Sequence, residues 1–154
     1  MSTTPLTEIY NFIQITDSLA TAGQPTADQF AAIKEAGYEI IINLALPTST
    51  NAIANEDEIV ANQGIAYIHI PVIWENPTLE DLDRFFQVMQ ENQDRKVFVH
   101  CAMNMRVSAF TYLYRVTQQQ IEPDIAKAAM DQIWTPNPTW QAFIQQAIQH
   151  YQSA

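Results

Sequence analysis

One cysteine and one arginine are spaced so that together they could bind and attack an oxyanion. The only cysteine, Cys101, follows the apolar run at 97–100, and Arg106 comes five positions later. The run predicts a buried strand and the segment after it predicts a helix, so Cys101 lies in the turn between them. A helix N-terminus binds anions and favours the thiolate form of a nearby cysteine, which is the nucleophile. The guanidinium of Arg106 can bind two oxygens of a tetrahedral oxyanion.

The neighbouring residues favour this interpretation over simpler ones. A free cysteine is often only a small buried hydrophobe, but a strand, a histidine, an arginine and a helix together indicate an anion-facing thiol. We expect the ring of His100 to point into the sheet, to hydrogen-bond a backbone carbonyl and so to orient the cysteine loop. A metal site built from His69, His100 and Cys101 would need three convergent ligands, and their spacing does not support one. No metal and no cofactor are therefore expected, and His69 is interpreted as a core or rim histidine.

Strands alternate with helices along the chain, which predicts an α/β fold with a central, mostly parallel sheet flanked by helices. The predicted strands are 12–15, 19–22, 39–46, 65–70 and 96–100. The predicted helices are 26–36, 55–62, 78–92, 106–119, 124–133 and 139–152. No repeat or linker-like stretch is visible, so residues 1–154 are expected to form a single domain. In such sheets the site lies beyond the carboxyl ends of the strands, here after Leu46, Ile70 and His100.

Several residues carry local signals. Thr26, with Gln29 three positions later, predicts a helix N-cap, and Thr78 predicts another. Gly37 and Gly64 are expected to end helices. In the cysteine loop, Asn104 is the only residue that tolerates a left-handed conformation well. Further expectations concern larger groups: a solvated first helical turn at Glu56, Asp57 and Glu58, and a core cluster of Trp134, Trp140 and Phe143.

Composition excludes several classes of function. The chain has 154 residues, a net charge of −10 and seven basic residues, which argues against nucleic-acid and anionic-lipid surfaces. No apolar run is long enough to span a membrane. The start has neither a basic region nor an apolar stretch, so a cytoplasmic location is expected unless a signal peptide has been removed. Three glycines and no GxGxxG or Walker motif argue against nucleotide loops. The oligomeric state is left open.

Four segments resemble the protein tyrosine phosphatase superfamily on its dual-specificity side. They look most like its small bacterial branch, which is also found fused to beta-lactamase-like hydrolases. The segments are Thr21–Phe30 (TAGQPTADQF), residues 42–46 (INLAL), His69–Thr78 (HIPVIWENPT) and Val99–Phe110 (VHCAMNMRVSAF).

The resemblance implies a dual-specificity phosphatase-like fold and a phosphatase that acts on a small phosphate monoester or related oxyanion. It implies that Cys101 attacks phosphorus and forms a phosphocysteine. Ser108 would hydrogen-bond the departing thiolate, and Glu75, on the loop after Ile70, would be the general acid. The substrate oxygens would be held by the loop of Ala102, Met103, Asn104, Met105 and Arg106, while Trp74 lines the pocket and Thr21 and Gln24 are candidates for its mouth.

The loop departs from the superfamily pattern in three ways. Four residues separate Cys101 from Arg106, where five are usual; the usual loop glycine is absent; and Val107 stands before the hydroxyl of Ser108. Four intervening residues is the length that rhodaneses use to hold a persulfide. Two alternatives to a phosphatase therefore stay open: sulfur transfer or persulfide handling on Cys101, and a non-catalytic module that binds an oxyanion.

Overall fold

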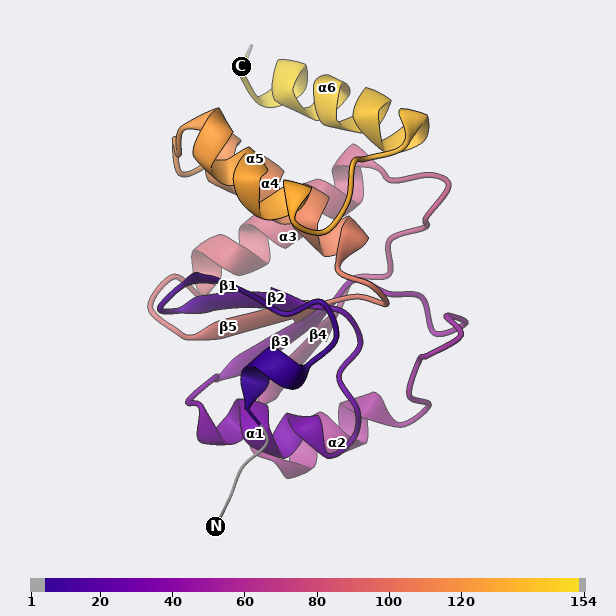
Figure 1. The fold of residues 1–154 in the computed structure, drawn as a ribbon, viewed down its shortest axis with the longest axis vertical. Coiled ribbons are helices and arrows are strands. Elements are labelled where there is room, and N and C mark those ends of the chain that lie inside the picture. The colour runs from indigo at the N-terminus through magenta and orange to yellow at the C-terminus, as the bar shows by residue number, and fades with distance from the viewer. Residues whose placement is uncertain (1–4, 153–154) are drawn as a thin grey trace.

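A five-stranded sheet organises the protein in the computed structural model, which describes residues 5–152. The strands are β1 (Ile13–Thr16), β2 (Leu19–Ala22), β3 (Ile40–Asn43), β4 (Ala66–His69) and β5 (Val97–His100). They lie in the order β1-β2-β5-β3-β4, and only the β1–β2 pair is antiparallel. The prediction of an α/β fold with a mostly parallel sheet is confirmed (Figure 1).

Helices cover both faces of this sheet. They are α1 (Gln29–Glu35), α2 (Glu56–Asn62), α3 (Leu79–Glu91), α4 (Met105–Thr117), α5 (Pro123–Asp131) and α6 (Pro138–Gln152), with a short 3-10 helix, η1, at Leu6–Glu8. Figure 1 shows α1 and α2 on one face and α3 to α6 on the other. None of the helices in the described part of the chain has the length and hydropathy needed to cross a bilayer.

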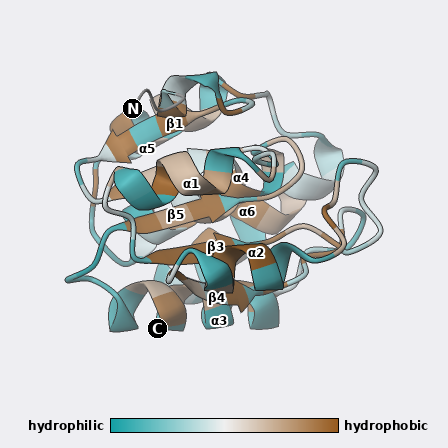
Figure 2. Ribbon diagram, turned by 90° about the horizontal axis from the view of Figure 1, so that it is seen from below, coloured by the Kyte–Doolittle hydropathy of each residue, from teal (hydrophilic) through white to brown (hydrophobic). Residues whose placement is uncertain are grey.

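The central strands explain the apolar runs of the sequence, because both of their faces are buried. Ile41 and Phe98 pack with Phe30 of α1 and Val60 of α2 on one face. The alternate residues of the same strands pack on the other face with α3, α4 and α6, where Trp140 and Phe143 are buried as predicted. Figure 2 shows hydrophobic residues along β3 and β5 in the middle of the molecule. Strands buried on both faces are typical of parallel sheets.

Two of the predicted boundaries are off by three residues, and at each of them a side chain makes a hydrogen bond to the backbone. The third strand ends at Asn43, not at Leu46, since the Oδ1 atom of Asn43 accepts from the amide of Ala45 at 2.8 Å. Helix α1 begins at Gln29, so Thr26 is not its N-cap. The side chain of Gln29 instead accepts from the Thr26 amide at 2.9 Å and stabilises the turn before the helix.

The other helix-end signals are confirmed. Thr78 caps α3, because its hydroxyl accepts from the amide of Asp81 at 3.1 Å. Gly37 and Gly64 follow helices. Their φ angles are +94° and +75°, values that residues other than glycine rarely adopt.

The register of the parallel strands brings their carboxyl ends together. His100 lies opposite both Ala22 and Asn43, and Asn43 lies opposite His69. The loop after β5 therefore leaves the sheet between the segments that follow β2 and β3. Gly23, directly after β2, approaches it so closely that an added Cβ atom would lie 2.9 Å from the carbonyl oxygen of Ala102 and 2.7 Å from the ring of Tyr10.

Gly23→Ala is expected to destabilise the protein by about 1–3 kcal/mol, because the added methyl group overlaps backbone that is held by the sheet. Urea denaturation should show a lower midpoint with an unchanged slope. A midpoint equal to that of the wild type would show that the cysteine loop can shift away at no cost.

Candidate active site

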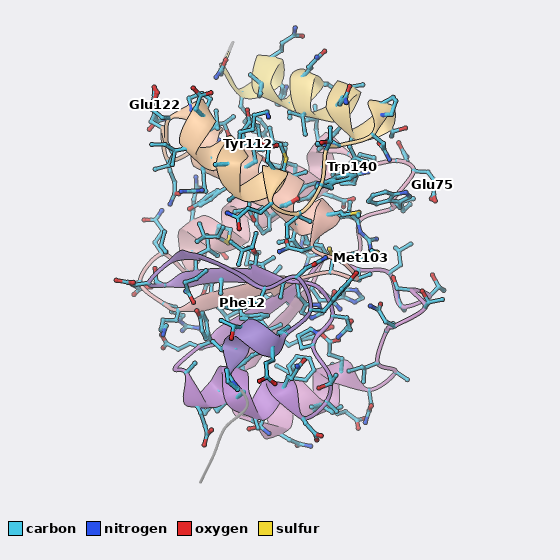
Figure 3. All side chains as sticks on the ribbon, viewed as in Figure 1. Phe12, Glu75, Met103, Tyr112, Glu122 and Trp140 are labelled. Carbon is cyan, nitrogen blue, oxygen red and sulfur yellow. The ribbon has the colours of Figure 1, made fainter. Side chains whose placement is uncertain are left out.

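A cavity of about 140 Å³ lies between the carboxyl end of β5 and the N-terminus of α4. That volume is several times the ~30 Å³ that a water molecule occupies in the liquid. The structure thus brings together most of the residues that the sequence singled out. The cavity is lined by Trp74, Cys101, Ala102, Met103, Met105 and Arg106. Cys101 is buried, while Met103, which is labelled in Figure 3, is 41% exposed.

Asn104 shapes this loop from behind and is absent from the cavity lining. Its φ of +66° is the left-handed conformation that the sequence predicted for this position. The buried side chain donates from Nδ2 to the carbonyl of Asn11 at 2.9 Å and to the hydroxyl of Thr21 at 3.2 Å. Asn104 therefore fixes the turn from strand to helix with its side chain, and contact of its backbone amide with substrate oxygens stays a prediction.

Other segments hold the carbonyl groups of the loop. The Ala102 carbonyl accepts from the amide of Gln24 and from Nδ2 of Asn51, both at 3.1 Å, and the Met103 carbonyl accepts from Asn11 at 2.9 Å. Within residues 5–152, the amides of Ala102, Met103, Met105 and Arg106 make no backbone hydrogen bond outside the regular elements. Free amides at the start of a helix are the usual anion-binding groups of proteins.

Arg106 is buried, and only part of its guanidinium is engaged. Its Nη1 atom donates to the carbonyl of Val72 at 3.0 Å, and its Cζ atom lies 5.9 Å from the ring centroid of Trp74. Its Nε atom has no hydrogen-bond partner although it is buried. The indole N–H of Trp140 donates to the carbonyl of Trp74 at 2.9 Å and so fixes the loop that carries both contacts. A buried donor without a partner is costly, and an anion would satisfy it.

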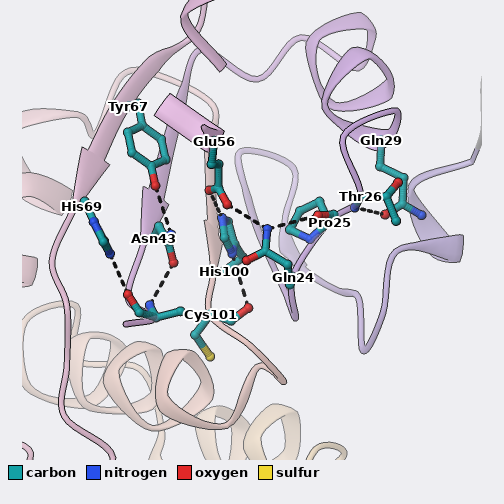
Figure 4. Close-up of polar contacts among 11 residues, drawn as sticks. Gln24, Pro25, Thr26, Gln29, Asn43, Glu56, Tyr67, His69, His100 and Cys101 are labelled. Atoms are coloured by element: carbon teal, nitrogen blue, oxygen red, sulfur yellow. Dashed lines mark hydrogen bonds and ion pairs between the residues drawn. The ribbon is translucent and has the colours of Figure 1, made fainter. Parts of the chain in front are cut away.

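His100 connects the cysteine loop to a buried carboxylate, as Figure 4 shows. Its Nδ1 atom lies 3.3 Å from the carbonyl oxygen of Cys101, which is the predicted hydrogen bond to a backbone carbonyl. Its Nε2 atom lies 2.6 Å from Oε2 of Glu56, and Oε1 of Glu56 accepts from Gln24 at 2.8 Å. Gln24 and Thr21 therefore serve the loop from behind and do not line the mouth of the cavity.

The prediction of a solvated turn at residues 56–58 is wrong for Glu56, which is 4% exposed, while Asp57 and Glu58 are exposed. Burial by itself would raise the pKa of Glu56, but hydrogen bonds and the charge of His100, with hydrogen bonds from Gln24 and Tyr67, outweigh it. The pKa of Glu56 is therefore held below its ordinary value, and the group is a carboxylate at neutral pH.

Two predicted catalytic residues lie away from the cavity. The hydroxyl of Ser108 donates its single proton to the carbonyl of Met105 at 2.7 Å and accepts from the indole of Trp134 at 2.9 Å. In this structure the proton of Ser108 is therefore directed at Met105, and its hydrogen bond to the departing thiolate of Cys101 stays a prediction. Glu75 is exposed, and Figure 3 shows it at the outer edge of the molecule, so the structure does not bring its carboxylate to Cys101.

The remaining histidine near the site is satisfied by the backbone. The Nε2 atom of His69 lies 2.6 Å from the carbonyl oxygen of Ala45, as expected for a core or rim histidine. Within residues 5–152, no three His, Cys, Asp or Glu side chains converge in a way that could hold a metal ion.

Comparisons with known proteins give matches over most of this chain. Residues 14–148 match the family model PTP-NADK, described as "DSP-PTPase phosphatase fused to NAD+ Kinase". The chain is 30% identical over 119 residues to the "Beta-lactamase hydrolase-like protein" of two Xylella fastidiosa strains, Temecula1 and 9a5c. The match covers 75% of this chain and 27% of those proteins, so the chain spans about a quarter of their length.

Solved structures share the fold over almost the whole chain. A "Putative phosphatase (DUF442)" from Shewanella putrefaciens CN-32 is 36% identical, with a TM-score of 0.86 that covers 95% of this chain and 96% of the other. PTPMT1 in complex with PI(5)P has a TM-score of 0.78 over 92% of this chain and 97% of the other. At 14% identity that likeness concerns the fold alone. The predicted dual-specificity phosphatase-like fold is confirmed.

Two substitutions of Asn104 are expected to separate backbone strain from hydrogen bonding. Asn104→Gly keeps the left-handed conformation and loses the side-chain hydrogen bonds, whereas Asn104→Ala loses both. Asn104→Ala should be the less stable of the two by about 1 kcal/mol, measured by chemical denaturation. Equal stability of the two variants would show that the loop does not need the positive φ.

Glu56 should also contribute a pH-dependent part of the stability. Because its folded pKa is below the ordinary value of 4.5, the contribution is present above that pH and is lost as the pH falls through the folded value. Glu56→Gln should cost about 1.5–3 kcal/mol at pH 5, and the cost should shrink toward pH 3.5. Glu58→Gln, in the same helical turn but exposed, is the control and should change little. A cost that is the same at both pH values contradicts the assignment.

Proposed function

The chain belongs to the PTP-NADK family of DSP-PTPase phosphatases, and we propose that it hydrolyses phosphate monoesters with Cys101 as the nucleophile. The single observation that carries this proposal is the cavity in which Cys101, Arg106 and the first amides of α4 meet. A thiol, a bidentate cation and free amides around one small space are what in-line attack on a tetrahedral phosphate requires.

In the proposed reaction, the Cys101 thiolate attacks phosphorus, so that an S–P bond forms as the P–O bond to the leaving group breaks. The departing oxygen keeps the bonding electron pair and takes up a proton. Water then attacks the phosphocysteine, the S–P bond breaks, and inorganic phosphate and the thiolate are released. Arg106 and the amides of residues 102, 103, 105 and 106 bind the three non-bridging oxygens, over which the negative charge is spread in the transition state.

The proton for the leaving oxygen has no carboxylate source in the cavity lining. Glu75 is the acid that the loop after Ile70 offers, and its role stays a prediction that requires the loop to bring the carboxylate inward. Without a general acid, a good leaving group such as an aryl oxide is expelled much faster than an alkoxide. We therefore expect aryl phosphates to be the better substrates.

The surroundings of the cavity favour a substrate with one phosphate and an apolar remainder. Arg106 is the only cationic residue that lines the cavity, and the protein carries a net charge of −10, so a polyanion would be repelled. Trp74 and Met103 form apolar parts of the lining. Ile73, which precedes Trp74 in the sequence, is 47% exposed, and Tyr10, whose ring lies beside Gly23, is 49% exposed.

The test is turnover of p-nitrophenyl phosphate by the wild type and by variants of the two central residues. Cys101→Ser should abolish turnover with the fold intact, because a hydroxyl is a far weaker nucleophile at neutral pH. Arg106→Lys should lower kcat by about 10²–10³, because a point charge cannot replace the planar fork. Arg84→Lys, at an exposed arginine of α3, is the matched control and should keep the wild-type rate.

Thiosulfate-to-cyanide sulfur transfer, measured beside the phosphatase assay, addresses the alternatives. Sulfur transfer without phosphate release would assign Cys101 to persulfide chemistry and overturn the proposal. Absence of both activities, with phosphate still raising the melting temperature, would make the protein an oxyanion-binding module. Full phosphatase activity in Cys101→Ser would exclude the thiol mechanism.

A further inference from the structure

We propose that Glu56 is a positioning residue for the reaction at Cys101, holding His100 as a doubly protonated ring and fixing the cysteine loop through Gln24. This inference rests on the proposed function for its effect on turnover. It concerns a carboxylate that lies 44 positions from His100 in the sequence and is absent from the lining of the catalytic cavity.

The number of protons on the His100 ring is inferred from the two groups that its nitrogens contact. Both ring nitrogens face groups that can only accept: a carboxylate oxygen of Glu56 at 2.6 Å and the carbonyl oxygen of Cys101 at 3.3 Å. A neutral imidazole has one N–H and one bare nitrogen, so it could donate to only one of them. The ring satisfies both contacts when each nitrogen carries a proton, which makes it an imidazolium.

The surroundings of the pair support this charge state. His100 is fully buried and Glu56 is 4% exposed, so solvent screens their attraction weakly. The ionisable group from another element that interacts with the pair is Tyr67 of β4. Burial, followed by the nearby Glu56 carboxylate, raises the pKa of Tyr67, so Tyr67 is neutral at physiological pH. Within residues 5–152, no lysine or arginine forms an ion pair with Glu56, and His100 is its cationic partner.

The second carboxylate oxygen of Glu56 acts on the other side of the loop. It accepts from the side chain of Gln24 at 2.8 Å, and the backbone amide of Gln24 donates to the carbonyl of Ala102 at 3.1 Å. One carboxylate therefore orients two residues whose hydrogen bonds end on consecutive carbonyl groups, those of Cys101 and Ala102. These carbonyls are held on the outer side of the turn, which leaves the inner side to amides and the thiol.

A positive ring next to the nucleophile has a chemical consequence. Figure 4 shows His100 between Glu56 and Cys101, so the cation is nearer to the thiol than the carboxylate is. An adjacent cation favours the thiolate. Glu56 thus raises the fraction of Cys101 that can attack, and its effect is on kcat and on thiol reactivity more than on substrate affinity.

The experiment compares Glu56→Gln with Glu58→Gln, which removes the same charge from the exposed side of α2. In Glu56→Gln, kcat for p-nitrophenyl phosphate should fall about tenfold or more with KM little changed. The rate of Cys101 alkylation by iodoacetamide should require a higher pH to reach the same value. Glu58→Gln should match the wild type in all three measurements. A folded Glu56→Gln variant with wild-type kcat and alkylation profile overturns the inference.

A spectroscopic measurement on the wild type makes the test independent of turnover and of the variant's folding. In the uniformly ¹⁵N-labelled protein, which has three histidines, both ring nitrogens of His100 should give imidazolium shifts at pH 7. A neutral tautomer at that pH overturns the inference. If the wild type hydrolyses no aryl phosphate, the proposed function fails by itself, while the ring signals and the alkylation profile still decide whether Glu56 positions His100 and activates the thiol.

Discussion

The passage from β5 into α4 is the constraint that determines the candidate site. The chain must change from an extended strand to a helix within residues 101–104, between the segments that follow two neighbouring strands. It does so through one left-handed residue, Asn104, and through a close approach to Gly23, where a side chain would not fit. Because the carbonyls of this turn are bound from outside, its amides and the sulfur remain on the inside. The chemistry of the loop thus follows from how its backbone hydrogen bonds are distributed.

The site buries two basic side chains, His100 and Arg106, in an otherwise acidic protein, and their partners differ. His100 lies against a carboxylate, whereas Arg106 has a carbonyl, an aromatic face and a free Nε atom. A buried cation without a carboxylate partner is costly to keep in the apo protein. An oxyanion would remove that cost. Relief of the unfavourable burial of Arg106 would therefore contribute to the free energy of anion binding.

Features that depend on residues close together in the sequence could be predicted, whereas features that depend on contacts between distant segments could not. The position of Cys101 between strand and helix, the left-handed Asn104 and the cap at Thr78 depend on neighbours within a few residues, and all three are confirmed. The burial of Glu56 depends on contacts with Gln24 and His100, far away in the sequence, so a charged residue at the start of a helix was assigned to solvent. One signal was available: a histidine at the end of an apolar strand needs a partner for each ring nitrogen. The sequence also does not reveal that the proton of Ser108 has an acceptor in its own helix, the Met105 carbonyl.

All three tryptophans of the chain gather at one place, with ring centroids between 5.3 and 6.1 Å apart, and Trp74 among them lines the cavity beside Arg106. At these separations the three indoles form one continuous aromatic cluster. All tryptophan fluorescence of the protein therefore originates in one cluster, and one member of that cluster lines the cavity. A molecule that binds beside Cys101 and Arg106 therefore contacts Trp74 directly, and tryptophan emission is the natural signal by which to follow that binding without an attached dye.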